Sequence, residues 1–148
     1  MQTSKNTILI TGGATGIGLG LAEQFLKQDN TVIICGRREN RLKEAKEKLP
    51  ALHTRVCDIT KIADRINLVS WVLENFPILN IVINNAGIQH NFNLNSPVDI
   101  SAVEKECDTN FIAAIKDDVF EAAIGFAANL RLKREELFHQ LNPEKQGS

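Results

Sequence analysis

The fold is decided by one stretch near the start of the chain, Thr7-Ile8-Leu9-Ile10-Thr11-Gly12-Gly13-Ala14-Thr15-Gly16-Ile17-Gly18. Its apolar run predicts a β-strand, its glycines a turn, and the residues that follow an amphipathic helix. Glycine permits positive φ and lets a ligand approach the backbone without meeting a Cβ atom, while the N–H groups of the new helix point out of its positive end. Such a turn suits a pyrophosphate, although a tight strand-to-helix connection without a ligand would have the same pattern.

The composition narrows the classes of protein to consider. The chain has 148 residues, enough for one domain, and its 17 basic and 18 acidic residues give a formal charge of -1. We therefore expect neither a nucleic acid nor an anionic membrane as a partner. No apolar run approaches the roughly 18 residues of a membrane span, and the first residues lack a signal peptide's apolar region, so we expect a cytoplasmic protein.

The pattern of cysteines also indicates a cytoplasmic protein. Cys35, Cys57 and Cys107 are widely spaced and form no C-x-x-C pair. This pattern predicts buried reduced thiols in a reducing compartment and no metal site.

The rest of the chain alternates between two hydrophobic patterns. Further strands are expected at residues 31–35, 52–57 and 79–83, and helices at residues 17–28, 39–49, 58–76 and 100–115. Asn30 is expected to cap the first helix in a left-handed conformation. Strands that alternate with helices predict an α/β domain with a parallel sheet.

The pattern changes at Lys116-Asp117-Asp118, where three charges interrupt an apolar helical face. No strand-like run follows, so the sheet is expected to stop at four strands. Residues 119–141 have an amphipathic helical pattern, and residues 146–148 are expected to be disordered. We therefore expect a single domain, in which residues 1–115 form a nucleotide-binding half and residues 116–148 a helical segment packed on it or on a partner.

Three motifs occur in order after successive strands: Thr11-Gly12-x-x-x-Gly16-Ile17-Gly18, then Asp58, then Asn84-Asn85-Ala86-Gly87. In combination they resemble the short-chain dehydrogenase/reductase family over about residues 5–115, and residues 34–42 look like its NADP-preferring bacterial members. The resemblance implies a three-layer, Rossmann-like, doubly wound parallel sheet, here truncated to about four strands in the order 3-2-1-4 plus a C-terminal helix.

The resemblance also assigns residues to a dinucleotide. The turn and the helix start would hold the pyrophosphate, Asp58 and Ile59 would contact the adenine, and Ala86 and Gly87 would border the adenosine ribose. Asn84 and Asn85 would stabilise the sheet. Asn85 is also assigned to the cofactor, and for Asn84 a structural role and a ligand-binding role are both open. Asp58 could alternatively be a helix cap, a role that Thr60 could also fill. The pyrophosphate residues are Gly12, Thr15, Gly16, Ile17 and Gly18.

Arg37 and Arg38 indicate which dinucleotide is preferred. An NAD site would carry an acidic residue at the end of the second strand, to accept the ribose hydroxyls. Gly36 stands there instead, followed by the two arginines. A guanidinium can pair bidentately with a 2′-phosphate, so NADP is favoured over NAD. The alternative is that both arginines only solvate the start of a helix, but two cations at a helix N-terminus oppose the helix dipole.

The catalytic half of the family pattern is not found. The family transfers hydride between a nicotinamide and a carbonyl or alcohol, with a tyrosine as acid/base, a lysine and a serine, but the chain contains no tyrosine. Asn110 matches the family's catalytic asparagine, or it makes a backbone hydrogen bond at a helix irregularity. His53, His90 and His139 stand in no catalytic motif.

Three functions are therefore open. The first is an NADP-dependent oxidoreductase with an unknown carbonyl or alcohol substrate, catalytically impaired in this chain. The second is a non-catalytic nucleotide-binding or assembly module, and the third is an interaction protein without a nucleotide. Because residues 81–83 would form an exposed sheet edge, we expect a homodimer, and exchange of the terminal helix is one way to form it.

Overall fold

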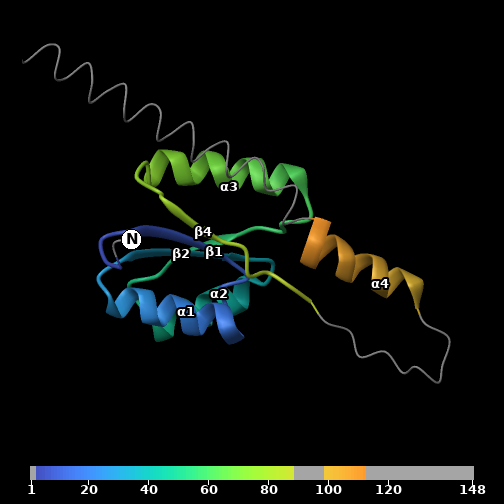
Figure 1. Cartoon of the computed structure of the whole chain (residues 1–148), viewed down its shortest axis with the longest axis horizontal. Helices are drawn as coiled ribbons and strands as arrows, with labels where there is room; N and C mark the ends of the chain where they lie inside the picture. The colour runs from blue at the N-terminus through green and yellow to red at the C-terminus, as the bar shows by residue number, and fades with distance from the viewer. Residues whose placement is uncertain (1–2, 89–98, 113–148) are drawn as a thin grey trace, which may run out of the picture.

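The computed structural model describes residues 3–88 and 99–112, and the elements of residues 3–88 form three layers (Figure 1). A parallel sheet of 4 strands in the order β3-β2-β1-β4 lies between α1 and α2 on one face and α3 on the other. The predicted strand order and fold class are confirmed. The elements are β1 (Thr7–Thr11), α1 (Gly16–Lys27), β2 (Thr31–Gly36), α2 (Glu39–Lys48), β3 (His53–Val56), α3 (Ile62–Asn75), β4 (Ile81–Ile83), α4 (Ile100–Cys107) and the π-helix η1 (Asp108–Ile112).

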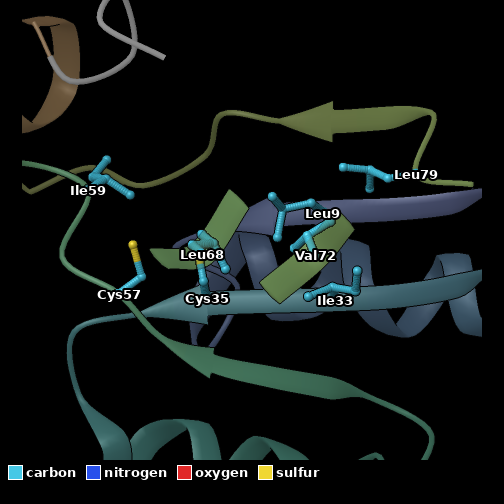
Figure 2. Close-up of a cluster of buried hydrophobic side chains, with 8 residues drawn as sticks. All are labelled: Leu9, Ile33, Cys35, Cys57, Ile59, Leu68, Val72 and Leu79. Carbon is cyan, nitrogen blue, oxygen red and sulfur yellow. The ribbon is translucent and has the colours of Figure 1, made fainter. Parts of the chain in front are cut away.

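The two central strands are buried because helices cover both of their faces. Alternate residues of β1 and β2 point to opposite faces, as the two-residue period of a strand requires. Leu9, Ile33 and Cys35 pack with Leu68 and Val72 of α3 in one cluster (Figure 2). The second cluster lies on the α1 and α2 side and contains Ile8, Ile10, Val32, Ile34, Ala22, Leu42, Ala45 and Leu52.

Three asparagines close the amino end of the sheet. The Asn30 side-chain oxygen accepts hydrogen bonds from the backbone and side-chain N–H groups of Asn6, at 2.9 and 3.1 Å. Asn80 donates to Asn6 Oδ1 at 2.9 Å and accepts from the backbone N–H of Thr7 at 2.9 Å. Asn30 also donates to the carbonyl oxygen of Phe25 at 3.0 Å. This network joins the starts of β1, β2 and β4.

Some local predictions were wrong. Asp29, with φ of 60°, takes the left-handed conformation expected of Asn30, whose side chain serves the asparagine network instead. Cys35 and Cys57 are buried as predicted, but Cys107 is exposed because α4 buries none of its residues. Ile17, the apolar second residue of α1, is 78% exposed.

The third helix begins later than predicted, at Ile62 rather than near Asp58. Lys61 occupies its N-cap position, so neither Asp58 nor Thr60 caps it. Ile62 and Ile66 lie on its exposed side, since Leu68 and Val72 define the side that meets the sheet.

Several predictions fall outside the described residues: the loop after residue 88, the end of the helix beyond residue 112, the helix at 119–141 and the disordered tail. The packing of residues 116–148 is outside them too, as are His90 and His139. In the parts of the chain that are described, none of the helices has the length and apolarity needed to cross a membrane.

Candidate functional site

A cavity of about 490 Å³ opens at the carboxyl ends of the strands. The loops after β1, β2, β3 and β4 all contribute to it, because the ends of parallel strands meet at one edge of the sheet. Every residue that the sequence assigned to the cofactor lines this cavity except Gly16 and Gly18. The lining consists of Gly12, Ala14, Thr15, Ile17, Gly36, Arg37, Arg38, Cys57, Asp58, Ile59, Asn85, Ala86, Gly87, Ile88 and Thr109.

The glycine turn after β1 has the conformation expected from its sequence. Gly12 and Gly16 have φ of 66° and 57°, which favours glycine. A Cβ atom on Gly12 would lie 2.7 Å from Ala86 Cα, so this glycine also lets the loops after β1 and β4 touch. A Cβ atom on Gly16 would have no neighbour within 4 Å among residues 3–88 and 99–112, so these residues leave this part of the turn open. The exposed Ile17 side chain stands beside it, at the start of α1.

Thr11 and Asn85 fix the two loops to each other. Thr11 Oγ1 accepts hydrogen bonds from the backbone N–H groups of Asn85 and Ala86, at 3.0 and 3.1 Å. The Asn85 amide in turn donates to the carbonyl oxygens of Thr11 and Gly12, at 3.1 and 3.2 Å. Asn85 therefore holds the glycine turn in place and lines the cavity as well, while Asn84, which is exposed, does not line it.

Arg37 and Arg38 form the cationic side of the cavity. Both are exposed, and within residues 3–88 and 99–112 neither guanidinium makes an ion pair or a hydrogen bond. Arg38 is the N-cap residue of α2 but its side chain makes no capping hydrogen bond. A Cβ atom on Gly36 would meet no atom of the described residues within 4 Å, so none of these residues fills the space beside that position. This arrangement suits an anionic group at the end of β2.

Asp58 and Ile59 lie across the cavity from the glycine turn, after β3. Asp58 Oδ1 accepts hydrogen bonds from the backbone N–H and the hydroxyl of Thr60, at 3.1 and 2.7 Å. Asp58 is half-buried and lines the cavity, whereas Ile59 is buried and joins the cluster of Figure 2.

Asn110 lies in the π-helix η1, the helix irregularity that one interpretation anticipated. Its side-chain oxygen accepts from the backbone N–H of Ile88 at 2.7 Å, and its amide donates to the carbonyl oxygen of Ile88 at 2.7 Å. The geometry is thus a clamp on the chain just after Gly87. Asn110 is not among the residues that line the cavity.

Sequence reasoning missed several contributors to the site. Cys57 and Thr109 line the cavity, yet their sequence contexts carry no binding motif. The sequence predicted no role for the Thr11 side chain, but its hydroxyl oxygen accepts two hydrogen bonds from the loop after β4. His53 begins β3, at the opposite end of the sheet from the cavity. No cluster of metal-ligating side chains occurs among the residues for which the structure gives positions.

Comparison with known proteins agrees with this geometry. The sequence model of the family described as short chain dehydrogenase matches residues 6–117. The chain belongs to the short-chain dehydrogenase/reductase family. An uncharacterized oxidoreductase, DltE of Bacillus subtilis, is 45% identical over 116 residues, which cover 78% of this chain and 46% of that protein. A short chain dehydrogenase/reductase of Gibberella zeae, dpfgG, is 35% identical over 115 residues, which cover 76% of this chain and 43% of that protein.

Solved structures of a dehydrogenase and of a reductase have the same fold. Serine dehydrogenase from Escherichia coli superposes with a TM-score of 0.72 at 25% identity, over 84% of this chain and 57% of that one. A 3-ketoacyl-(acyl-carrier-protein) reductase from Brucella melitensis, complexed with NADH, superposes with a TM-score of 0.71 at 27% identity. The match covers 77% of this chain and 47% of that one. The chain thus spans about half the length of these relatives.

Proposed function

We propose that this chain binds NADP(H) as the nucleotide-binding half of a short-chain dehydrogenase/reductase that interconverts a carbonyl and an alcohol. The observation that carries the proposal is the cavity, which four strand ends build and in which a glycine turn faces two arginines without ion pairs among the described residues. Two features fit the cofactor: the open space at Gly16 and the empty space at Gly36. The bound cofactor supplies the hydride at C4 of its nicotinamide, and this chain's residues bind and orient it.

The pyrophosphate is assigned to the glycine turn. The backbone from Gly12 to Thr15 leads directly into α1, whose first N–H groups have no partner within the helix and whose positive dipole end favours an anion. In this assignment, Thr15 and Ile17 border the phosphates. Gly18 acts indirectly, because a Cβ atom there would lie 2.7 Å from the carbonyl oxygen of Gly12 and would displace the turn.

The arginines support NADP over NAD. Arg37 and Arg38 are available for a 2′-phosphate, because within the described residues neither pairs with a carboxylate. Gly36 offers no side chain to accept a hydrogen bond from a ribose hydroxyl. On the other side of the cavity, Asp58 and Ile59 are assigned to the adenine, and Ala86 and Gly87 to the ribose.

Hydride transfer by these 148 residues alone is proposed to be impaired. A carbonyl reduction needs a proton donor near the reacting oxygen, and the family's tyrosine has no counterpart because the chain contains none. Asn110 is the remaining family position, proposed to hold a proton-relay water, and its two side-chain contacts are already made to Ile88. The absence of tyrosine favours a second candidate function, a nucleotide-binding or assembly module without turnover.

We further propose a homodimer in the cytoplasm. β4 is an edge of the sheet in the described residues, and an edge strand can pair with another chain. A single monomeric mass in light scattering at high protein concentration would contradict the dimer. The buried reduced thiols of Cys35 and Cys57 fit a reducing compartment, and recovery of the protein outside the cytoplasmic fraction of its cells would contradict that assignment.

Calorimetric titration tests the nucleotide assignment. If the adenosine end supplies most contacts, NADP and 2′,5′-ADP bind with similar affinity and NAD binds more weakly. A large advantage of NADP over 2′,5′-ADP would place the nicotinamide in contact with this chain. A carbonyl-reduction assay with NADPH separates the two candidates, since binding without turnover supports the module and turnover supports the oxidoreductase.

A further inference from the structure

The turn between β3 and α3 is held by side chains that lie outside the family motifs. Asp64, in the first turn of α3, accepts a hydrogen bond at Oδ2 from the backbone N–H of Asp58, at 2.8 Å. Its neighbour Arg65 donates from Nη1 to the carbonyl oxygen of Ile59, at 2.5 Å. Asp64 and Arg65 of α3 therefore hydrogen-bond to the backbone of Asp58 and Ile59. These two residues line the cavity on the side assigned to the adenine.

Hydrogen bonds also give the Asp58 carboxylate a defined orientation. Oδ1 is occupied by the backbone N–H and the hydroxyl of Thr60. Oδ2 has no hydrogen-bond partner among residues 3–88 and 99–112, and the side chain lines the cavity. An ionised carboxylate oxygen can only accept hydrogen bonds, so the group at this position favours a ligand that offers a donor.

Arg65 is an unusual residue for its position. It is 4% exposed, in a helix that packs against the sheet through Leu68 and Val72. Burying a guanidinium costs free energy unless it is hydrogen-bonded, and an aliphatic side chain would fill the space without that cost. The hydrogen bond to Ile59 gives Arg65 a role that an aliphatic residue lacks, which is to fix the backbone of the turn beside the cavity.

We propose that Asp64 and Arg65 are positioning residues for base selection: they hold Asp58 and Ile59 so that the nucleotide base is read by its exocyclic amino group. The inference rests on the proposed function, because it requires a nucleotide in the cavity. The selected ligand class is a 6-aminopurine nucleotide, whose amino group donates to the carboxylate. A 6-oxopurine presents an acceptor at the same place and is disfavoured.

The test compares NADP with its hypoxanthine analogue, in which an oxygen replaces the adenine amino group, by calorimetric titration. We expect the wild-type protein to prefer NADP by about tenfold, the effect of one hydrogen bond to a charged group. Asp64→Ala abolishes most of this preference by weakening NADP binding and leaving analogue binding nearly unchanged. Asp64→Asn retains the preference, because its amide oxygen still accepts from the Asp58 N–H group.

Two further variants complete the experiment. Glu74→Ala, on the exposed surface near the end of the same helix, is the matched control and leaves both affinities unchanged. Arg65→Lys keeps one donor for the Ile59 carbonyl and is expected to retain part of the preference. Circular dichroism shows whether Arg65→Lys folds. If this variant does not fold, the Asp64→Ala and Asp64→Asn variants decide the outcome, because Asp64 is only half-buried.

The possible results separate this inference from the proposed function. A wild-type protein that binds neither nucleotide overturns both. Equal wild-type binding of the two nucleotides, or an Asp64→Ala variant that keeps the full preference, overturns the inference and leaves NADP binding intact. Equal loss of both affinities in Asp64→Ala also overturns it, because Asp64 would then only stabilise the fold.

Discussion

The two ends of the sheet differ in whether their polar side chains have partners within the protein. At the amino end, Asn6, Asn30 and Asn80 hydrogen-bond to one another and to nearby backbone groups. At the carboxyl end, Arg37 and Arg38 line an open cavity and make no ion pair within the described residues. The asparagines of the amino end are thus paired within the protein. The carboxyl end combines internal hydrogen bonds, such as those between Thr11 and Asn85, with two guanidinium groups that have no ion pair in the described part of the chain.

The difference follows from the direction of the strands. Because all four strands are parallel, every loop that enters the sheet lies at one end and every loop that leaves it at the other. Loops at the carboxyl end precede helices and present helix N-termini to a ligand. The two ends can therefore be perturbed independently, and a variant at one end should leave the property of the other unchanged.

The largest expected effect is at the amino end. Asn30→Ala removes the hydrogen bonds to Asn6, Phe25 and Thr3 and leaves buried groups without partners, so the free energy of unfolding should fall by about 3 kcal/mol. Urea denaturation measures this loss. The control is Gln28→Ala, whose side chain is exposed beside the same turn. A decrease of NADP affinity in the folded Asn30→Ala protein would show that the two ends are coupled.

A smaller effect is expected at the carboxyl end. Replacing both Arg37 and Arg38 by alanine should weaken NADP binding about thirtyfold, or by about 2 kcal/mol, through the loss of charge-assisted hydrogen bonds to the 2′-phosphate. The affinity for NAD and the denaturation midpoint should hardly change. Arg41→Ala is the control, because Arg41 pairs with Glu44 at 2.8 Å on α2. An equal loss of NAD binding would assign the arginines to the pyrophosphate instead.

The smallest effect concerns His53, at the start of β3. Burial, and then the charge of Lys46, lower the pKa of this imidazole below its usual 6.5. The unfolded chain therefore binds a proton more readily, so stability is full above the unfolded pKa and decreases as the pH falls below it. Between about pH 7.5 and about pH 5.5, wild type should lose more stability than His53→Gln in urea denaturation. Parallel pH profiles would contradict the lowered pKa.

Sequence reasoning located the strands and the loops of the site well. β-branched runs at β1 and β2 have few alternatives to a buried strand, and glycine and asparagine motifs mark the ends of strands. The start of α3 was misplaced because Asp58 and Thr60 are common capping residues, yet their side chains bond within the turn before the helix. Asn30 was assigned a left-handed φ since asparagine tolerates it, but Asp29 adopts it and frees Asn30 for the network.

The sequence by itself determined the order of elements, the glycine turn, the arginines after β2 and the absence of tyrosine. These depend on local patterns and on composition, which a single chain displays. Tertiary structure alone decided which groups meet: Thr11 with Asn85, 74 residues later, and Arg65 with the carbonyl of Ile59. The physical reason is that a parallel sheet aligns the ends of strands that are distant in the chain, so the partners of a buried polar group follow from packing and leave no local signal.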